Sequence, residues 1–522
     1  MVVRLWLTFI LIGSFLALTT PLGEGFDEAW HLAYIQYIAQ NRTIPPKPTT
    51  RISREITQFI HTHPVPWALY TSYPNLKSYE QYWGQTEATR EETDQHLAAM
   101  TFSGSYMETD SELSALYESI QPPLYYYLSA PLFLLSSRIS SFLTTFLVMR
   151  LWSVLLASLT VPVVFSLARE VNENRDSRAF QQGVALLVVV FPGMYPGITR
   201  VCSDSLSLPL ACFCSMLLLR SLKRPQTMNP YLLGIFLLAG LWTRAFFIPI
   251  TAAMILVLLF YRNFRTAGIL TAALLPGSIW YLLNLTRTGS FTGLSIMGTA
   301  RPSIASSIQT LFHLDWVNLF NVGASSHIYI GNWSFLTVRS WMYLVISRFF
   351  LIGLLGFARR PRMLLEKHVL PFAVMYCSYI AALIYYGTQV FQQSGTSVIE
   401  GWYMTSLVPI EAVLFAEGAI GWSARHAKWM ILAFVCLLTP LLIYSAVFVA
   451  LPYYAGITSH GAMTFHPHWS DFPLMSSRLL RFYPWIPTFT PWLLLAAAVC
   501  LVGYSTWKFI VDARGNRAPG WM

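Results

Sequence analysis

Long apolar runs almost free of charge constrain this chain more than any other feature of its sequence. Trp429–Leu451 and Trp492–Ile510 are each long enough to cross a bilayer as one helix, which takes about 20 residues. Charged residues make up 11% of the 522 positions, whereas soluble domains carry about 25%. The sequence therefore predicts an all-α integral membrane protein.

The Lys and Arg residues lie in short clusters between the apolar runs, so the net charge of +10 does not form a basic stripe. Clusters of this kind mark cytoplasmic loops, and we expect no nucleic-acid partner. Five of the six cysteines lie inside apolar runs, and Cys202 lies at the edge of one. That pattern predicts neither a disulfide framework nor a zinc motif.

The basic clusters set the predicted topology, because each is placed in the cytoplasm and an even number of spans must separate neighbouring clusters. The segment 121–137 opens with Gln121-Pro-Pro-Leu-Tyr-Tyr-Tyr127 and would leave an odd number if it crossed. We predict that it lies at or dips into the outer surface, so that about 12 spans leave both termini cytoplasmic. The predicted spans are 5–20, 142–168, 181–199, 204–220, 230–245, 246–261, 266–284, 337–357, 368–387, 402–421, 429–450 and 490–510.

Three polar segments then face outward, at 21–121, 285–336 and 452–491. The first is the largest and contains a Pro-rich stretch and a helical stretch near Glu87–Met100. We divide the chain into a transmembrane module, 1–360, which includes the outer loop 21–121, and C-terminal helices, 361–522, with the outer loop 452–491. Residues 1–20 are predicted to be an uncleaved first span, and a cleaved signal peptide is the alternative.

The segment directly after the first span, Gly23-Glu-Gly-Phe-Asp-Glu-Ala-Trp-His31, carries the strongest candidates for chemistry. It leads into a predicted amphipathic helix, Glu28–Gln40, on which Asp27, Glu28 and His31 share one face. Carboxylates beside an imidazole can activate a nucleophile or bind a cation. The alternative is that Asp27 only caps the helix. The apolar side of the helix is predicted to hold Trp30, Tyr34, Tyr37 and Ile38.

Arginines at the outer ends of spans are the second group of candidates. Arg200 and Asp204 flank Val-Cys-Ser and can neutralise each other. Arg244 lies between two short spans, on the side where the positive-inside rule does not place cations. It has no acidic neighbour in sequence, so a lipid phosphate is a natural partner, and snorkelling to the interface is the alternative. Weaker candidates are Arg150, Glu400, His313, Asp315 and His327.

Several short motifs, in the same order along the chain, resemble those of GT-C membrane glycosyltransferases, which use polyprenyl-phosphate sugars. Phe26-Asp-Glu-Ala-Trp-His31 resembles their acidic segment after the first span, and the 121–137 segment resembles their "HPPLYY" helix. The chain is similar in this respect to protein O-mannosyltransferases and aminoarabinose transferase-like proteins. The remaining matches are Arg200–Ser205, Gly240-Leu-Trp-Thr-Arg244, Trp280-Tyr-Leu-Leu-Asn-Leu-Thr-Arg-Thr-Gly289 and Glu400-Gly-Trp-Tyr403, the last with Trp402 where the family has Arg.

The resemblance implies transfer of a sugar from a polyprenyl-phosphate donor to a glycan, lipid or protein acceptor on the non-cytoplasmic face. It implies Asp27 as the base, with Glu28 and His31 orienting it or holding a divalent metal. Arg244 and Arg200 would bind the donor phosphate, and Asp204 would position the sugar or an arginine. Tyr125, Glu400 and Tyr403 would contact substrate.

The resemblance places the protein in the cell envelope, in a bacterial inner membrane with the site facing the periplasm or exterior. It implies no certain cofactor, and the partners expected are the bilayer, the donor lipid and the acceptor. Two other functions remain open. One is a transporter of lipid-linked sugars, and the other is a non-catalytic subunit of a membrane complex.

Overall fold

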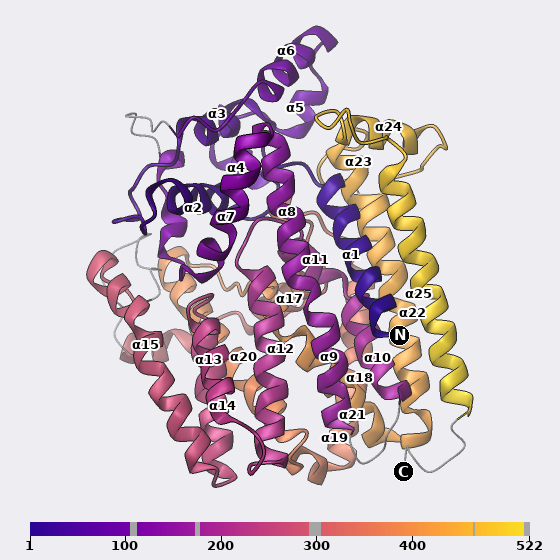
Figure 1. Cartoon of the computed structure of the whole chain (residues 1–522). Helices are drawn as coiled ribbons and strands as arrows, with labels where there is room; N and C mark the ends of the chain where they lie inside the picture. The colour runs from indigo at the N-terminus through magenta and orange to yellow at the C-terminus, as the bar shows by residue number, and fades with distance from the viewer. Residues whose placement is uncertain (105–111, 173–177, 292–303, 463–464, 516–522) are drawn as a thin grey trace.

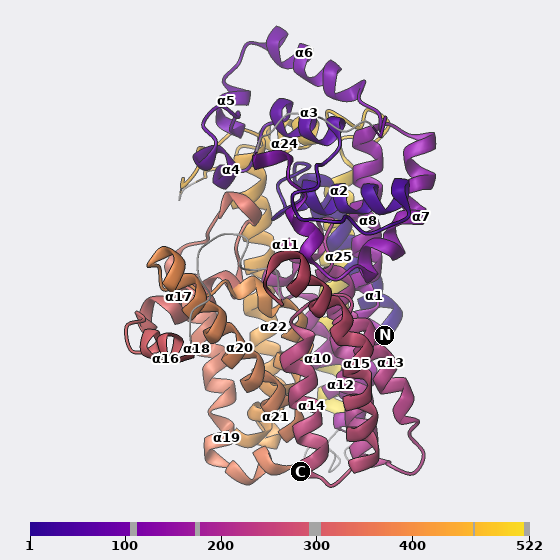
Figure 2. The same cartoon turned by 90° about the vertical axis from the view of Figure 1, so that its left-hand side faces the viewer.

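The computed structural model describes residues 1–104, 112–172, 178–291, 304–462 and 465–515. Within these ranges the chain is helical, and its only β-structure consists of isolated bridges. Figures 1 and 2 show a bundle of long helices with a cap at one end, built mainly from the residues between α1 and α7. The cap corresponds to the large first outer loop predicted from the sequence.

Nine helical segments of the described ranges are long and apolar enough to cross a membrane, so the chain is an all-α integral membrane protein. A tenth is α10 (Arg178–Val189) with η4 (Pro192–Met194) and α11 (Tyr195–Ile198), which is bent by 50°. The nine consist of α1 (Val2–Thr19), α8 with α9 (Phe142–Ser158, Thr160–Val171), α12 (Asp204–Lys223), α15 (Phe264–Thr288), α18 with α19 (Ser340–Leu354, Gly356–Arg359), α20 (Leu370–Ser394), η8 with α21 (Gly401–Leu407, Val408–Trp422), α22 with η9 and α23 (Ala424–Tyr444, Ser445–Ala450, Leu451–Tyr454), and α25 (Thr490–Gly515).

Two of the predicted spans are short helices that form a hairpin. These are α13 (Pro230–Leu241) and α14 (Phe247–Phe260), which measure about 18 and 21 Å at 1.5 Å per residue, against a hydrocarbon core of about 30 Å. Basic residues precede the first helix and follow the second. A hairpin anchored at that end stops short of the opposite surface, so its turn, which carries Arg244, lies within the bundle.

The segment predicted not to cross forms α7 (Leu124–Ile139). It is absent from the candidate spans among the described residues, in agreement with that prediction. It packs against α8 and against α2 (Glu28–Asn41), and both views place it at the level of the cap. The helix therefore belongs to the region where the cap meets the bundle.

The cap contains a helix where one was predicted, α6 (Glu87–Ala98). The prediction that α2 is amphipathic is wrong, because the helix is buried on nearly every side between the cap and α7. The remaining cap helices are α3 (Arg54–Thr62), α4 (Trp67–Ser72), α5 (Tyr79–Trp83), η1 (Glu112–Ser114) and η2 (Tyr117–Ile120).

Helices from the two predicted modules pack together throughout the bundle. The last helix, α25, runs along α1, and α20 packs on α14. The outer segments between the later spans hold α16 (Ile304–Leu311), α17 (Trp316–Ile328), η6 (Asn332–Ser334) and α24 (Asp471–Leu479). The division at residue 360 stays a prediction, and the termini are likewise placed in the cytoplasm by prediction alone.

Candidate functional site

Four chain segments that are distant in sequence bring charged side chains together where the cap meets the bundle. Asp27 comes directly before α2, Arg200 lies in the turn between α11 and α12, Asp204 begins α12, and Arg244 lies in the hairpin turn. Gly25 permits the first two segments to approach, because a Cβ there would lie 2.6 Å from the Cβ of Arg200. The sequence candidates Asp27, Arg200, Asp204 and Arg244 therefore form one group.

Asp27 does not act as a helix cap, although it occupies the capping position of α2. Its carboxylate bonds no amide of the first turn and instead accepts a hydrogen bond from the hydroxyl of Tyr117. Its φ of 55° is left-handed, a conformation that costs a non-glycine residue energy and is frequent at functional sites. By the exposure of the whole residue, Asp27 is only partly buried.

Two buried arginines share the single carboxylate of Asp204. Arg244 Nη2 lies 2.7 Å from Asp204 Oδ1, and Arg200 Nη2 lies 3.2 Å from Oδ2. Arg200 also donates to the carbonyl of Phe26, at 2.5 Å, directly before Asp27. The fold thus supplies Arg244 with an acidic partner that the local sequence lacks, and the buried side chain does not snorkel.

The guanidinium groups retain unused hydrogen-bonding capacity. The Nε atoms of Arg200 and Arg244 are buried, and neither has a partner among the described residues. The two side chains belong to residues that are only 5% and 6% exposed. Buried donors without partners are rare in proteins and call for an explanation. An anion bound between them would supply both the acceptors and the missing negative charge.

His31 and Glu118 complete the group on the cap side. Burial, aided by the two arginines, lowers the pKa of His31 well below its ordinary value, so the ring is neutral. Its Nδ1 lies 2.8 Å from the hydroxyl of Tyr126 and 3.4 Å from Glu118 Oε2. Burial raises the pKa of Glu118 to about 8, and the nearby charge of Asp27 adds to this effect.

Burial also raises the pKa of Asp27, and the hydroxyl of Tyr117 and the charges of Arg200 and Arg244 oppose that increase. A carboxylate with a raised pKa is a stronger base than an exposed one. Arg200, which bonds the carbonyl of Phe26, lies close to Asp27. The site thus pairs a basic carboxylate with two cations.

Glu28 faces away from this group. Its carboxylate forms a bidentate pair with Arg150, with both N–O distances 2.6 Å. It also accepts from the backbone amides of Gly23, Gly25 and Val201. The side chains of Glu28 and His31 thus bond different partners, Arg150 and Tyr126. Among the described residues, no group of three or more His, Cys, Asp or Glu is placed to hold a metal. The residues present do not fit the predicted metal site.

Of the predicted substrate contacts, Tyr403 lies beside the charged group, whereas Tyr125 bonds elsewhere. Tyr125 is fully buried and its hydroxyl bonds Ser153, at 2.8 Å, so its neighbour Tyr126 takes the place at the cluster. Trp402 stacks on Phe26 with ring centroids 4.5 Å apart. Tyr403 packs on Phe246, beside Arg244, and Glu400 and Tyr403 both interact with Tyr386.

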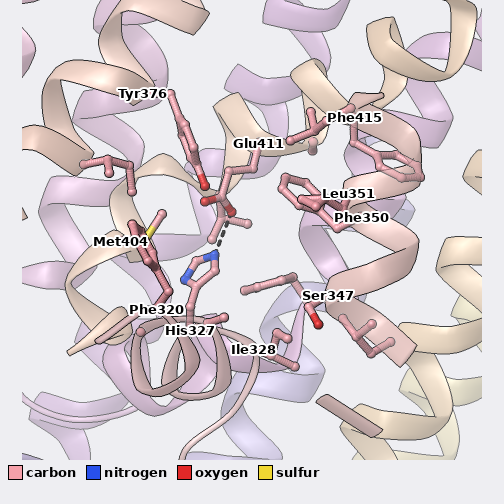
Figure 3. A pocket seen from close by; sticks show the side chains of 18 of the residues that line it. Phe320, His327, Ile328, Ser347, Phe350, Leu351, Tyr376, Met404, Glu411 and Phe415 are labelled. Carbon is pink, nitrogen blue, oxygen red and sulfur yellow. Dashed lines mark hydrogen bonds and ion pairs between the residues drawn. The ribbon is translucent and has the colours of Figure 1, made fainter. Parts of the chain in front are cut away.

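An apolar cavity of about 420 Å³ opens on the other side of η8. Its walls come from α17, α18, α20, α21 and α22, and Met404 of η8 belongs to them (Figure 3). Most residues of α18 and α20 are not buried inside the protein, so the cavity lies beside helix surface that faces lipid. Figure 3 shows one ion pair in this apolar setting, between His327 and Glu411, at 2.7 Å.

Sequence reasoning missed Tyr117, Glu118 and Tyr126. A signal was present, because Tyr117-Glu118 is separated by just two residues from the Gln121-Pro-Pro segment that was singled out. An acid three residues before a segment at the membrane surface is unusual enough to notice. The choice between Tyr125 and Tyr126 depends on the helix rotation of α7, which the sequence pattern of three consecutive tyrosines leaves undetermined.

No known family model matches the chain, and no curated protein matches its sequence. The structure is similar to ArnT from Cupriavidus metallidurans in the apo state, at 13% identity and a TM-score of 0.44, over 97% of this chain and 77% of that one. It is also similar to that protein bound to undecaprenyl phosphate, at 14% identity with the same TM-score and coverage. A likeness this distant assigns no reaction, so function rests on the residues of the chain itself.

Proposed function

We propose that the protein transfers a sugar from a polyprenyl-phosphate carrier to an acceptor on the non-cytoplasmic face of the membrane. The observation that carries the proposal is the pair of buried arginines that share Asp204, keep unpartnered Nε–H groups and lie beside Asp27. A phosphate needs cations, and the acceptor needs a base. The group contains both.

In the proposed reaction, Asp27 takes the proton from an acceptor hydroxyl as its oxygen bonds the anomeric carbon. The bond from that carbon to the phosphate oxygen breaks, and its electron pair leaves with the polyprenyl phosphate. Arg200 and Arg244 stabilise the charge that develops on this oxygen. Asp204 holds the two guanidinium groups in place.

The carrier's isoprenoid chain requires an apolar path beside the phosphate site. The cavity under η8 lies next to lipid and is lined almost entirely by apolar side chains. Met404, in its wall, follows Trp402 and Tyr403, which face the charged group. We assign the cavity to the chain of the donor.

The distribution of charge favours transfer over transport. A transporter places ionisable groups near the bilayer midplane, often in repeated halves. Here the group lies under the cap, at the outer ends of α12 and of the α13–α14 hairpin. By the positive-inside rule, the cap faces away from the cytoplasm, and we propose that this side is the periplasm or exterior of a bacterial inner membrane. The acceptor is a glycan, a lipid or a protein.

Binding of polyprenyl phosphate to the purified protein in nanodiscs tests the proposal. Arg244→Ala should weaken binding by roughly 2–5 kcal/mol, because a buried charge pair is lost. Arg244→Lys keeps the positive charge but loses the planar guanidinium, which can donate two hydrogen bonds to one phosphate. It should therefore weaken binding less than Arg244→Ala. The control is Arg287→Ala, which removes an arginine that bonds the Pro45 and Pro46 carbonyls in the cap. Unchanged binding in Arg244→Ala would remove the arginine from the site.

A further inference from the structure

Gly401, the first residue of η8, bonds α17 through both of its backbone groups. The amide of Gly401 donates to Ser326 Oγ at 2.8 Å, and its carbonyl lies 3.2 Å from His327 Nδ1. A Cβ at position 401 would lie 2.0 Å from the carbonyl oxygen of Gly323, so only glycine fits this contact. Both backbone groups of Gly401 are therefore bonded to consecutive residues at the end of α17.

The ring of His327 connects Gly401 to Glu411. A carbonyl oxygen only accepts hydrogen bonds, so Nδ1 must donate to Gly401. The other ring nitrogen, Nε2, lies 2.7 Å from Glu411 Oε2. Burial lowers the pKa of His327, but ion pairing and hydrogen bonding to Glu411 outweigh it, and the pKa is raised. Glu411 thus fixes both the proton and the orientation of the ring.

Apart from the hydroxyls of Tyr376 and Ser347, the surroundings of this pair are apolar. Phe191, Phe350 and Phe415 line the same cavity, and Figure 3 shows Tyr376 turned toward Glu411. A buried ion pair contributes little stability compared with apolar residues of the same size. Ionisable groups at such depth usually serve a function. What this pair holds is the start of η8.

We propose that His327 and Glu411 are positioning residues that fix η8, and through it Trp402 and Tyr403, against the charged group. Trp402 stacks on Phe26, and Tyr403 packs on Phe246 beside Arg244. A shift of Gly401 would move both rings and also the cavity wall at Met404. The consequence for catalysis rests on the proposed function. The claim that His327 and Glu411 fix the position of η8 does not.

The double substitution His327→Leu with Glu411→Leu tests whether these two residues fix the position of η8. Leucines suit the apolar cavity and replace both partners of the ion pair, so the variant should still fold. The carbonyl of Gly401 nevertheless loses its donor. Hydrogen–deuterium exchange of the amides in 402–407 should accelerate about tenfold or more, the size expected for losing a hydrogen bond to a charged group. Protection of 402–407 equal to the parent would overturn the proposal.

Two single variants separate positioning from packing. Glu411→Gln still offers His327 Nε2 a hydrogen-bond partner and should keep the parent's exchange rates. Ser347→Ala alters the same cavity wall without touching Gly401 and should do the same, since Ser347 bonds the carbonyl of Tyr343. Acceleration in Ser347→Ala equal to that in the double variant would show that cavity packing alone controls η8, and would also overturn the proposal.

Transfer from a polyprenyl-phosphate sugar is measured on the same proteins. The double variant should have a higher KM for the donor, and Glu411→Gln should resemble the parent. If the parent transfers no sugar, the proposed function fails. The hydrogen–deuterium exchange result still tests whether His327 and Glu411 fix the position of η8. Parent-like donor kinetics in a double variant with fast exchange would overturn the link between η8 and the site.

Discussion

At the scale of single residues, two neighbouring acids have different surroundings. Asp27 is partly exposed and faces Tyr117 and the arginines, whereas Glu28 is fully buried and bonded to Arg150. Asp27 lies directly before α2 in a left-handed backbone conformation, whereas Glu28 is the first residue of the helix, so the two side chains take different directions. We infer that Glu28 stabilises the fold and that Asp27 takes part in the reaction.

Glu28→Gln should therefore destabilise the protein. Breaking a buried ion pair at one partner costs about 3–5 kcal/mol, because Arg150 is left with an uncompensated charge. Thermal unfolding in detergent measures the effect, with Glu92→Gln, on the exposed face of α6, as the control. A Glu28→Gln protein as stable as the parent but without transfer activity would instead place Glu28 in the reaction.

The candidate site was predictable where polar residues interrupt an apolar pattern. Asp27, Arg200, Asp204 and Arg244 stand out for that reason, and the structure brings them together. The partners were not predictable, because Arg150 meets Glu28 across 122 positions of sequence. Spacing alone placed Glu28 with Asp27, and only the fold separates them.

At the scale of elements, the buried carboxylate of Glu24 joins three outer segments. It accepts from the amide and hydroxyl of Ser334, at 2.9 and 3.0 Å, and from the hydroxyl of Tyr454, at 3.1 Å. Burial raises its pKa from 4.5 to about 8, although these hydrogen bonds oppose the shift. The folded protein therefore binds a proton that the unfolded chain releases above pH 4.5.

The sign of the resulting pH dependence follows from that difference. The stability linked to Glu24 is fully present below pH 4.5 and is lost as pH rises to about 8, by up to about 5 kcal/mol. Between pH 5 and 8, the parent should lose more thermal stability than Glu24→Gln, which cannot titrate. Parallel melting curves of the two proteins across this range would show that Glu24 keeps an ordinary pKa.

Helix lengths explain why two predicted spans differ from the structure. The apolar runs at 230–245 and 246–261 meet at Trp-Thr-Arg-Ala-Phe, and hydropathy assigns those turn residues to the spans. The structure ends α13 at Leu241 and begins α14 at Phe247. Apolar character was thus predicted correctly, but the helix ends depend on how Arg244 turns toward Asp204.

At the scale of the whole molecule, orientation in the membrane follows from the basic clusters. Cysteine at Thr86, which is exposed in the cap, should react with an impermeant thiol reagent added outside cells. Cysteine at Arg425, at the start of α22, should not. The exposed native cysteines, Cys377, Cys436 and Cys500, lie in spans, where lipid shields them. Labelling at position 425 but not at 86 would invert the topology.

The central claim is that Asp27 is the base in sugar transfer. The most direct measurement is the release of polyprenyl phosphate from a polyprenyl-phosphate sugar by the purified parent and Asp27→Asn proteins, with acceptor present. The account predicts a fall in rate of at least about 100-fold, the low end for losing a general base, with unchanged polyprenyl-phosphate binding and thermal stability. Release by Asp27→Asn at nearly the parent's rate would contradict it.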